Sequence, residues 1–254
     1  MVYAVSSTEA MPRRKVMKSP GNGAERWRTE YFGAVGSGQF LPGPQAFMID
    51  MREDDEILPH FHEVDQFQVF VAGGGSIGRK DEGLEPVTVH YADRYTGYGP
   101  ILAGPGGSAY FTLRARTDPG PVYLHQPGYR ERLRPSAKRH FSQKAALSTP
   151  AVMQARASVL TEPVAGDAAV SGPRATMIRA GAGVAFDTAD PAGSGGYFLL
   201  VLQGGVAYAG QDYPAWSVLF VAPEDRALAL RAGDGGCELL QLHFDAQDPA
   251  QVAT

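Results

Sequence analysis

The stretch FQVFVAGGGSIG at residues 67–78 recurs as FLLVLQGGVAYA at residues 198–209, at an offset of 131 residues. Both copies join a short apolar run to consecutive glycines. A second stretch, AGPGGSAYFTLRA at residues 103–115, recurs as AGDGGCELLQLHF at residues 232–244, at an offset of 129 residues. Two ordered similarities at nearly one offset indicate an internal duplication. We therefore expect two copies of one domain.

Each copy reads as short apolar segments separated by Gly, Pro and Asp, which is the pattern of an all-β sandwich or barrel. The 31 Gly and 19 Pro among 254 residues also exclude a protein built of long helices. We place hairpin turns at Gly73–Gly75 and Gly204–Gly205. The expected strands are residues 46–51, 67–71, 87–91 and 109–114 in the first copy, and residues 176–179, 197–202, 217–221 and 238–244 in the second.

The expected strands at 67–71 and 197–202 carry apolar side chains on both faces. Successive side chains of a strand point to opposite faces, so Phe67 and Val69 lie on one face and Phe70 on the other. A strand of this kind needs apolar cover on both sides. The other copy, the leader or a second subunit supplies this cover, and we expect a homodimer.

The chain carries a net charge of −4 and has a pI near 5.9, which argues against binding to nucleic acid or to an anionic membrane surface. Its longest apolar run, residues 197–202, is far shorter than the roughly 20 residues of a membrane-spanning helix. The single cysteine, Cys237, rules out an intramolecular disulfide and is typical of a reducing compartment. We expect a cytoplasmic protein whose partner is a small molecule.

Changes in composition divide the chain into four segments. Residues 1–24 are charged without a following apolar run, and we expect a flexible leader there. Residues 129–165 form a basic connector, within which we expect a short helix at 136–157. The two copies occupy residues 25–128 and 166–254.

Residues 58–74 read LPHFHEVDQFQVFVAGG and carry the most distinctive chemical pattern. On an extended strand, His60 and His62 share a face at a backbone separation of roughly 6–7 Å, which allows both imidazoles to bind one metal ion. The chain then turns at 63–65 and places the amide of Gln66 beside them. Imidazole and oxygen ligands suit Fe, Mn, Ni, Cu or Zn. The alternative is a pair of polar strand residues that bind no metal.

This segment resembles the first signature of the cupin superfamily, G-x5-H-x-H-x3,4-E-x6-G. His60, His62 and Gly73 match it, whereas Gln66 stands where the family has Glu and Asp54 stands where it has its first Gly. The resemblance implies a bicupin, with two jelly-roll β-barrels in tandem joined by a short connector. It also implies that His60, His62 and Gln66 bind a divalent metal ion, Fe, Mn, Ni or Zn, in the N-terminal barrel.

The second cupin signature, G-x5-P-x-G-x2-H-x3-N, matches less closely. Gly99, Pro105 and Gly107 fit it, but Tyr110 stands at the metal-binding His and Arg114 at the Asn. At most three protein ligands then remain, which leaves metal positions open for a substrate. The same loss is also consistent with a site that binds no metal.

Two further observations concern the ligand set. His90, in the expected strand 87–91, is the candidate replacement for the missing ligand, although a lone strand histidine more often packs or forms a hydrogen bond. In the second copy, the offset of 131 residues puts Pro191, Gly193 and Tyr197 opposite the three candidate ligands. We therefore expect the C-terminal barrel to bind no metal.

Tyr98, Tyr110 and Arg114 are the candidate catalytic residues, because at the mouth of the barrel they would orient an anionic or carbonyl substrate. The resemblance implies a metal-dependent small-molecule enzyme, either a dioxygenase-like oxidoreductase or an isomerase or lyase. The alternative is a bicupin that binds or senses a small ligand without turnover, since only Glu63 and Asp65 supply carboxylates near the site. A purely structural duplicated sandwich leaves the two histidines unexplained.

Overall fold

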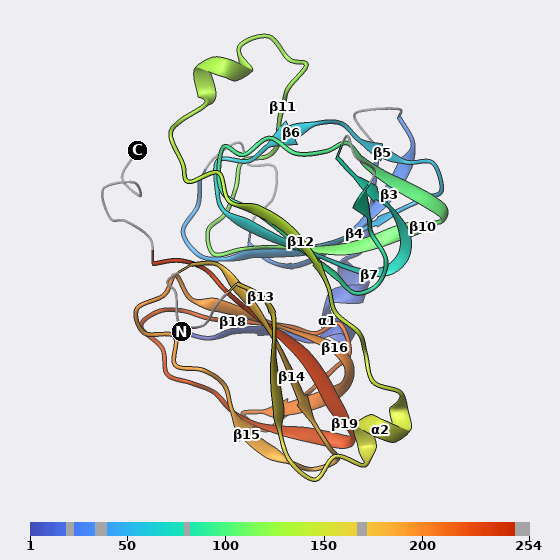
Figure 1. The fold of residues 1–254 in the computed structure, drawn as a ribbon, viewed down its shortest axis with the longest axis vertical. Helices are drawn as coiled ribbons and strands as arrows, with labels where there is room; N and C mark the ends of the chain where they lie inside the picture. Colours follow the sequence, from blue (N-terminus) through green and yellow to red (C-terminus); the bar gives the residue numbers. More distant parts are fainter. Residues whose placement is uncertain (19–22, 34–39, 79–81, 167–171, 247–254) are drawn as a thin grey trace. The chain divides into compact units, whose positions relative to one another are not determined.

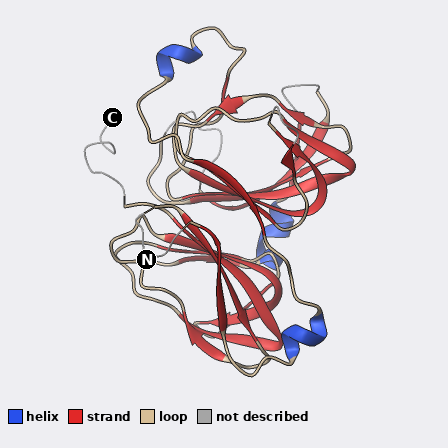
Figure 2. Ribbon diagram, in the orientation of Figure 1, coloured by secondary structure: helices blue, strands red, loops and turns tan. Residues whose placement is uncertain are grey.

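The computed structural model describes residues 1–18, 23–33, 40–78, 82–166 and 172–246. Its elements are mostly antiparallel strands, and the predicted all-β fold is confirmed (Figures 1 and 2). The chain forms two compact units: the N-terminal unit is Met11–Ala146, and the C-terminal unit consists of Met1–Ala10 together with Leu147–Thr254. Among the described residues, no helix is long and apolar enough to cross a membrane.

The N-terminal unit contains the strands β2 (Lys15–Lys18), β3 (Glu25–Phe32), β4 (Gln45–Met51), β5 (Glu56–Ile57), β6 (His60–Phe61), β7 (Gln66–Ile77), β8 (Glu82–Gly83), β9 (Thr88–Ala92), β10 (Ile101–Arg114), β11 (Val122–Tyr123) and β12 (His140–Lys144). Its main sheet has the order β12–β9–β7–β10–β4–β3–β2, with β5 paired to β10 and β8 to β7. A separate ribbon joins β6 to β11.

The C-terminal unit contains the strands β1 (Tyr3–Val5), β13 (Leu160–Ala165), β14 (Arg174–Ala180), β15 (Ala185–Asp187), β16 (Tyr197–Tyr208), β17 (Gln211–Pro214), β18 (Val218–Val221) and β19 (Ala229–His243). They form a single sheet of order β1–β18–β16–β19–β14–β13, in which β15 also pairs with β19 and β17 with β16.

The two sheets repeat one strand order. The strands β9, β7, β10, β4 and β3 lie in the same order as β18, β16, β19, β14 and β13. The short strands correspond as well, because β8 and β17 pair with β7 and β16, and β5 and β15 pair with β10 and β19. Every strand expected from the sequence coincides with an observed strand, or lies inside a longer one, to within one residue. This correspondence is what a duplicated domain would show.

The glycines of the repeat lie inside strands, so the hairpin turns expected at Gly73–Gly75 and Gly204–Gly205 are wrong. Gly73 has a φ of 70°, and a Cβ there would lie 2.2 Å from the backbone oxygen of Gly107 on β10. Gly204 has a φ of 69° and would meet the oxygen of Gly236 at 2.0 Å. These positions are irregularities in the strand register, where two backbones approach more closely than a side chain allows.

Much of the expected flexible leader forms regular structure instead. The strand β1 pairs with β18, and Val2 and Ala4 pack against the apolar core of the C-terminal unit. In the helix α1 (Ser7–Ala10), Ser6 Oγ accepts from Glu9 N at 3.2 Å and Glu9 Oε2 accepts from Ser6 N at 2.9 Å, which is a capping box. After η1 (Met11–Arg13), β2 pairs with β3. Apolar burial and edge pairing therefore order this segment.

The basic connector is mostly extended. It contains η2 (Tyr129–Arg132) and then β12, which pairs with β9 and so belongs to the N-terminal unit. The helix expected at 136–157 is confirmed only for α2 (Pro150–Gln154). Thr149 caps this helix by accepting from Val152 N at 3.4 Å.

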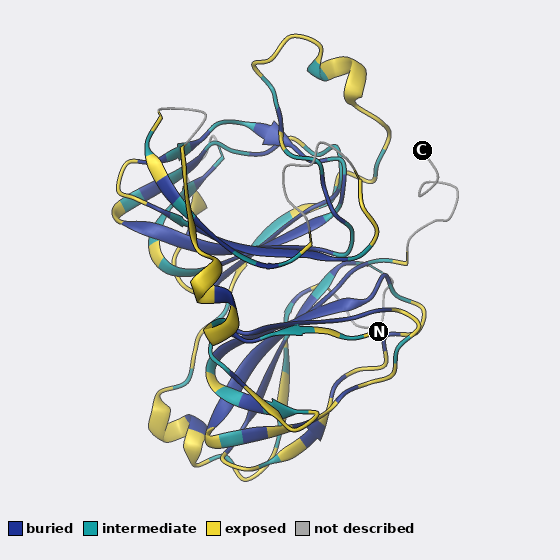
Figure 3. Cartoon of the chain, turned by 180° about the vertical axis from the view of Figure 1, so that it is seen from behind, coloured by how far each residue is buried: buried dark blue, intermediate teal, exposed yellow. Residues whose placement is uncertain are grey.

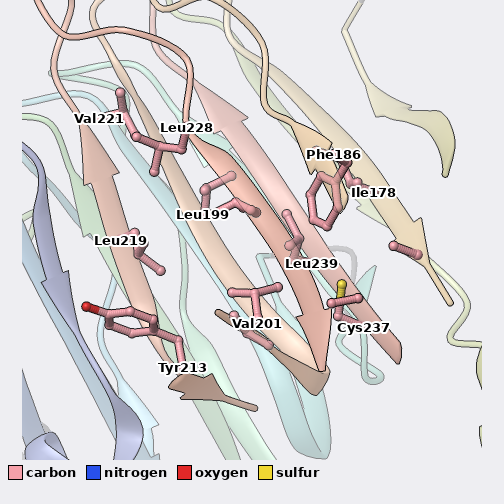
Figure 4. Close-up of a cluster of buried hydrophobic side chains, with 14 of the residues drawn as sticks. Ile178, Phe186, Leu199, Val201, Tyr213, Leu219, Val221, Leu228, Cys237 and Leu239 are labelled. Carbon is pink, nitrogen blue, oxygen red and sulfur yellow. The ribbon is translucent and has the colours of Figure 1, made fainter. Parts of the chain in front are cut away.

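The two units have different interiors. In the C-terminal unit, apolar side chains of β16, β18 and β19 form one cluster, which includes Leu199, Val201, Leu219 and Leu239 (Figure 4). In the N-terminal unit, an apolar cluster around Phe70 is accompanied by many buried polar side chains. Figure 3 shows buried residues along the strands of both units, whereas the short helices are largely exposed.

Substitution of Gly204 tests the close approach of β16 and β19. We expect Gly204→Ala to lower the free energy of unfolding by at least ~3 kcal/mol, because the added methyl group meets the oxygen of Gly236. Gly210→Ala is the control, since Gly210 has a φ of 79° but no atom within 4 Å of an added Cβ. The control should lose only ~1–2 kcal/mol in urea unfolding. Equal losses for both variants would contradict this explanation.

Candidate functional site

The predicted site residues come together where several strands end. Gln66 begins β7 and Arg114 ends β10, and these antiparallel neighbours bring the two residues side by side. His60 begins β6 and forms a backbone bridge with Tyr98, in which the two N–H···O distances are 3.1 and 3.0 Å. His62 follows β6 directly. All five side chains are buried.

The hydrogen bonds of His60 fix its tautomer. Its Nδ1 lies 2.7 Å from the carbonyl oxygen of Leu58, which can only accept, so Nδ1 carries the proton. The other nitrogen, Nε2, then accepts from the Tyr98 hydroxyl at 2.9 Å. That hydroxyl in turn accepts a hydrogen bond from Gln66 Nε2. The lone pair of His60 Nε2 is therefore already in use.

His62 has the same tautomer for a similar reason. Its Nδ1 lies 2.7 Å from Asp118 Oδ2, and a carboxylate oxygen accepts, so Nδ1 donates. His62 Nε2 then accepts from Arg114 Nη2 at 3.1 Å. The two imidazole rings lie 5.0 Å apart, between centroids, at an interplanar angle of 86°.

The guanidinium of Arg114 lies at the centre of this network. Its Nε and Nη2 donate to Gln66 Oε1 at 3.0 and 2.9 Å. Its Nη1 donates to Gln45 Oε1 at 2.6 Å and lies 3.3 Å from Asp118 Oδ2. With the bond to His62, these contacts account for the donors of the guanidinium.

At neutral pH these hydrogen-bonded residues, the histidine network, contain one cation, one carboxylate and two neutral imidazoles. Its members are His60, His62, Gln66, Tyr98, Arg114 and Asp118. Burial, and then the proximity of His62, lower the pKa of His60 to about 3. Burial and the charge of Arg114 also lower the pKa of His62. Burial by itself raises the pKa of Asp118, but contact with His62 and the charge of Arg114 outweigh it and bring that pKa to about 2. The charges of Arg114 and Asp118 thus offset each other.

A cavity of about 420 Å³ opens beside His60 and His62. Its wall is partly apolar, with Phe47, Ile49 and Ile57, and it also includes Tyr110 and Tyr123. Cationic side chains of β2, β3 and β10 face the same space, namely Lys18, Arg26, Arg28 and Arg114. The volume lies within the range of small-molecule sites, roughly 300–1,000 Å³.

The two candidate catalytic residues on β10 have different surroundings from those expected. Arg114, rather than Tyr110, is the residue that contacts both His62 and Gln66. Tyr110 lies four residues earlier on β10, and its ring packs 4.8 Å from that of Phe70 while lining the cavity. Tyr110 therefore belongs to the cavity wall and Arg114 to the histidine network.

The predicted ligand atoms do not fit a divalent metal ion in this arrangement. His60 Nε2, His62 Nε2 and Gln66 Oε1 each already accept a hydrogen bond, from Tyr98 or from Arg114. A guanidinium 3.1 Å from His62 Nε2 would also repel a metal cation. Over the part of the chain that the structure describes, no group of three or more His, Cys, Asp and Glu side chains is placed to hold a metal ion.

The carboxylate of the site is Asp118, which the sequence reasoning misses. The carboxylates that it considers, Glu63 and Asp65, have other contacts. Glu63 pairs with Arg132 at 2.8 Å, and Asp65 Oδ1 accepts from Arg94 N at 2.8 Å. Asp118 follows Arg114 by four residues, and this spacing is the one available signal in the sequence.

Gln45, Arg26 and Arg28 are also missed. The two arginines are two residues apart on β3, so their side chains point to the same face of the strand, and both line the cavity. The Arg-x-Arg spacing is the sequence signal for this shared face. His90, the candidate replacement ligand, forms a hydrogen bond with Ser142 and contacts the network only through the ring of Tyr98. Its Nδ1 lies 3.0 Å from Ser142 Oγ, and its ring lies 5.2 Å from the Tyr98 ring.

No protein-family model and no curated protein matches the chain. Solved structures do match it. A candidate dioxygenase from Nostoc punctiforme is similar with a TM-score of 0.62 and 11% identity, over 99% of this chain and 85% of that chain. Oxalate decarboxylase from Bacillus subtilis gives 0.59 and 10%, over 96% and 76%. Bacterial pirin from Escherichia coli, in complex with nickel(II), gives 0.58 and 11%, over 97% and 100%.

These three proteins have the cupin fold. At such low identity the similarity concerns the fold and not the reaction. The chain therefore has the cupin jelly-roll fold that its sequence predicts.

Removal of Asp118 tests the balance of charge in the site. We expect Asp118→Ala to lower the free energy of unfolding by ~3–5 kcal/mol, because it leaves the guanidinium of Arg114 buried without its counter-ion. Since the pKa of Asp118 is about 2 in the folded state against 3.8 for a free carboxyl, its contribution is present above pH 3.8 and is lost as the pH falls through 2.

Glu85→Ala is the control for this experiment. Glu85 pairs with Lys144 at the surface, where an ion pair contributes at most ~1 kcal/mol. Urea unfolding at pH 7 measures both variants. If Asp118→Ala is no more destabilising than Glu85→Ala, the buried pair does not stabilise the site.

Proposed function

We propose that the N-terminal unit binds a small organic molecule in the cavity beside His60 and His62, and that it does so without a divalent metal ion. The observation that carries this proposal is the position of Arg114, whose guanidinium contacts His62 Nε2 and Gln66 Oε1. A fixed organic cation thus stands where the resemblance to cupins implies a metal. The proposal agrees with the small-molecule partner expected from the sequence, and it specifies no reaction.

In this proposal Arg114 is a positioning residue. Its donors bond to protein acceptors, so it holds the side chains of His62 and Gln66 rather than the ligand. Gln66 in turn orients the Tyr98 hydroxyl toward His60. The wall of the cavity is therefore set before a ligand enters, which lowers the entropic cost of binding.

The C-terminal unit serves as a structural domain in this proposal. The matching strand orders support descent of both units from one duplicated cupin domain. The interior of the C-terminal unit is an apolar cluster, and no candidate ligand stands at the positions that correspond to His60 and His62. The homodimer and the cytoplasmic location stay predictions.

A metal-dependent, dioxygenase-like enzyme is the second candidate. The burial of His60 and His62 with their rings 5.0 Å apart favours it, as does the fold shared with a nickel-bound pirin. In that case the ion would be bound by His60, His62 and Gln66. The hydrogen bonds that Tyr98 and Arg114 donate to these ligand atoms would have to break first. This requirement gives the two candidates opposite expectations for metal content.

Metal analysis distinguishes the two candidates. Protein purified without chelator or metal-affinity resin is incubated with Mn(II), Ni(II) or Zn(II), desalted and analysed for metals. We expect the wild type to retain far less than one ion per chain. We expect Arg114→His to retain about one Zn(II), because it removes the cation and adds a third imidazole beside His62 and Gln66.

Arg116→His is the matched control, since it adds an imidazole two residues away without removing Arg114 and should retain no additional metal. One tightly held ion per wild-type chain that disappears in His60→Ala would overturn the metal-free proposal and support the dioxygenase-like enzyme.

A further inference from the structure

We propose that the cavity ligand is a small organic carboxylate with an apolar body, and that Arg28 is the residue that binds its carboxylate. This inference rests on the proposed function, because it assumes that the cavity of the N-terminal unit is the binding site. Arg28 plays no part in the histidine network and is not one of the residues that the cupin signatures single out.

Arg28 is a buried cation with an unused donor. It lies on β3, is 8% exposed and lines the cavity. Its guanidinium stacks over the ring of Phe47 at 3.4 Å, and its Nε lies 2.8 Å from Glu30 Oε1. Its Nη2 is buried and has no hydrogen-bond partner among the described residues. A buried donor in this state costs free energy, which an acceptor on a ligand would recover.

The cavity also favours an anion over a neutral ligand. Four cationic side chains line it, and Asp118 is the one carboxylate in the described lining. Arg26 pairs with Asp55 at 3.0 Å, Arg28 pairs with Glu30, and Arg114 pairs with Asp118, so three of the four cations have a counter-ion. The remaining charge, on Lys18 at the exposed rim, is uncompensated within this set. A monoanion therefore balances the site.

Arg28 retains its charge at neutral pH. Burial lowers its pKa to about 10, and the nearby charge of Arg114 acts in the same direction, while Glu30 opposes both. A guanidinium is planar and offers its N–H groups in one plane, which matches the geometry of a carboxylate, and the contacts with Phe47 and Glu30 restrict where this plane lies. Phosphate, with a higher charge and no apolar part, suits the site less well.

The rest of the wall identifies the body of the ligand. Phe47, Ile49 and Ile57 supply apolar surface next to Arg28. Gln68 also lines the cavity, and its Oε1, like Asp118 Oδ1, is a buried polar atom without a hydrogen-bond partner among the described residues. The space thus combines an anion-binding guanidinium, apolar contact area and one neutral acceptor, which is the usual composition of a small-molecule site.

The test uses matched carboxylate and carboxamide pairs, from acetate and acetamide to 3-phenylpropanoate and its amide, with inorganic phosphate as a separate probe. Ligand-observed NMR and titration measure binding to the full chain. We expect the best carboxylate to bind at least tenfold more tightly than its carboxamide. Arg28→Gln should weaken that carboxylate by at least tenfold and leave the carboxamide unchanged.

Arg52→Gln is the matched control variant. Arg52 also stacks on an aromatic ring, that of Trp27 at 4.6 Å, and pairs with a glutamate, Glu25, but it lies outside the cavity lining. It should not change carboxylate binding. Arg28→Lys keeps the charge without the planar fork and should give an intermediate loss, which protects the test if Arg28→Gln folds poorly.

The outcomes separate the two proposals. Carboxamides that bind as tightly as carboxylates, phosphate that binds more tightly than any carboxylate, or a full affinity in Arg28→Gln would each overturn the carboxylate assignment and leave the cavity as a small-molecule site. If Arg28→Gln and His62→Ala both bind the ligand with the affinity of the wild type, the ligand binds outside this cavity. That result would overturn the proposed function too.

Discussion

The buried guanidinium of Arg114 is the constraint on which the N-terminal site depends. A charge taken out of water is costly unless counter-charge and acceptors surround it. Here Asp118 supplies the counter-charge, and Gln66, Gln45 and His62 supply neutral acceptors. Each of these acceptors must present a particular atom, so Arg114 constrains the orientation of the side chains that surround it.

This constraint explains the glutamine at position 66. A glutamate could accept from Arg114, but it could not donate to the Tyr98 hydroxyl at neutral pH. Gln66 does both, because its Oε1 accepts from Arg114 while its Nε2 donates to Tyr98. The hydroxyl proton of Tyr98 is then directed at His60 Nε2. The glutamine and the arginine, which both differ from the cupin signatures, are thus linked by direct hydrogen bonds.

The sequence predicts the fold better than it predicts the site, and particular residues show why. Strands such as β7 and β16 are visible as apolar segments that recur at one offset. The sequence predicts turns at the glycines 73 and 204, where the structure has strand irregularities. A turn and a strand irregularity can both require a positive φ, and only the partner strand distinguishes them. The composition of a segment does not show which strand lies beside it.

The same limitation applies to the site. The pairing of His60 with His62 follows from strand alternation, which is local. The contacts of Gln66 with Arg114, and of His62 with Asp118, join residues 48 and 56 positions apart. They depend on the register between β7 and β10 and on the loop that follows β10, neither of which periodicity specifies. The one signal in the sequence for this contact is the spacing of four residues between Arg114 and Asp118, and such a spacing alone is weak evidence for a buried ion pair.

The two units show how one strand framework supports different interiors. The position of Arg114 on β10 corresponds to His243 on β19, and that of Gln45 on β4 corresponds to Arg174 on β14. In both units these residues form a cross-strand hydrogen bond. In the C-terminal unit the guanidinium is on β14 instead, where Arg174 Nη2 donates to His243 Nδ1 at 3.1 Å.

With the cation on β14, which is separated from β16 by β19, strand β16 carries no amide side chains at the matching positions. Tyr197, Leu199 and Val201 stand where β7 has Gln66, Gln68 and Phe70, and they join the apolar cluster of that unit. Burial of such side chains contributes ~1.5–3 kcal/mol each. The C-terminal unit therefore gains stability from positions that the N-terminal unit uses for polar contacts. The strand that carries the arginine thus differs between the two units, and so does the polarity of the side chains on the strands beside it.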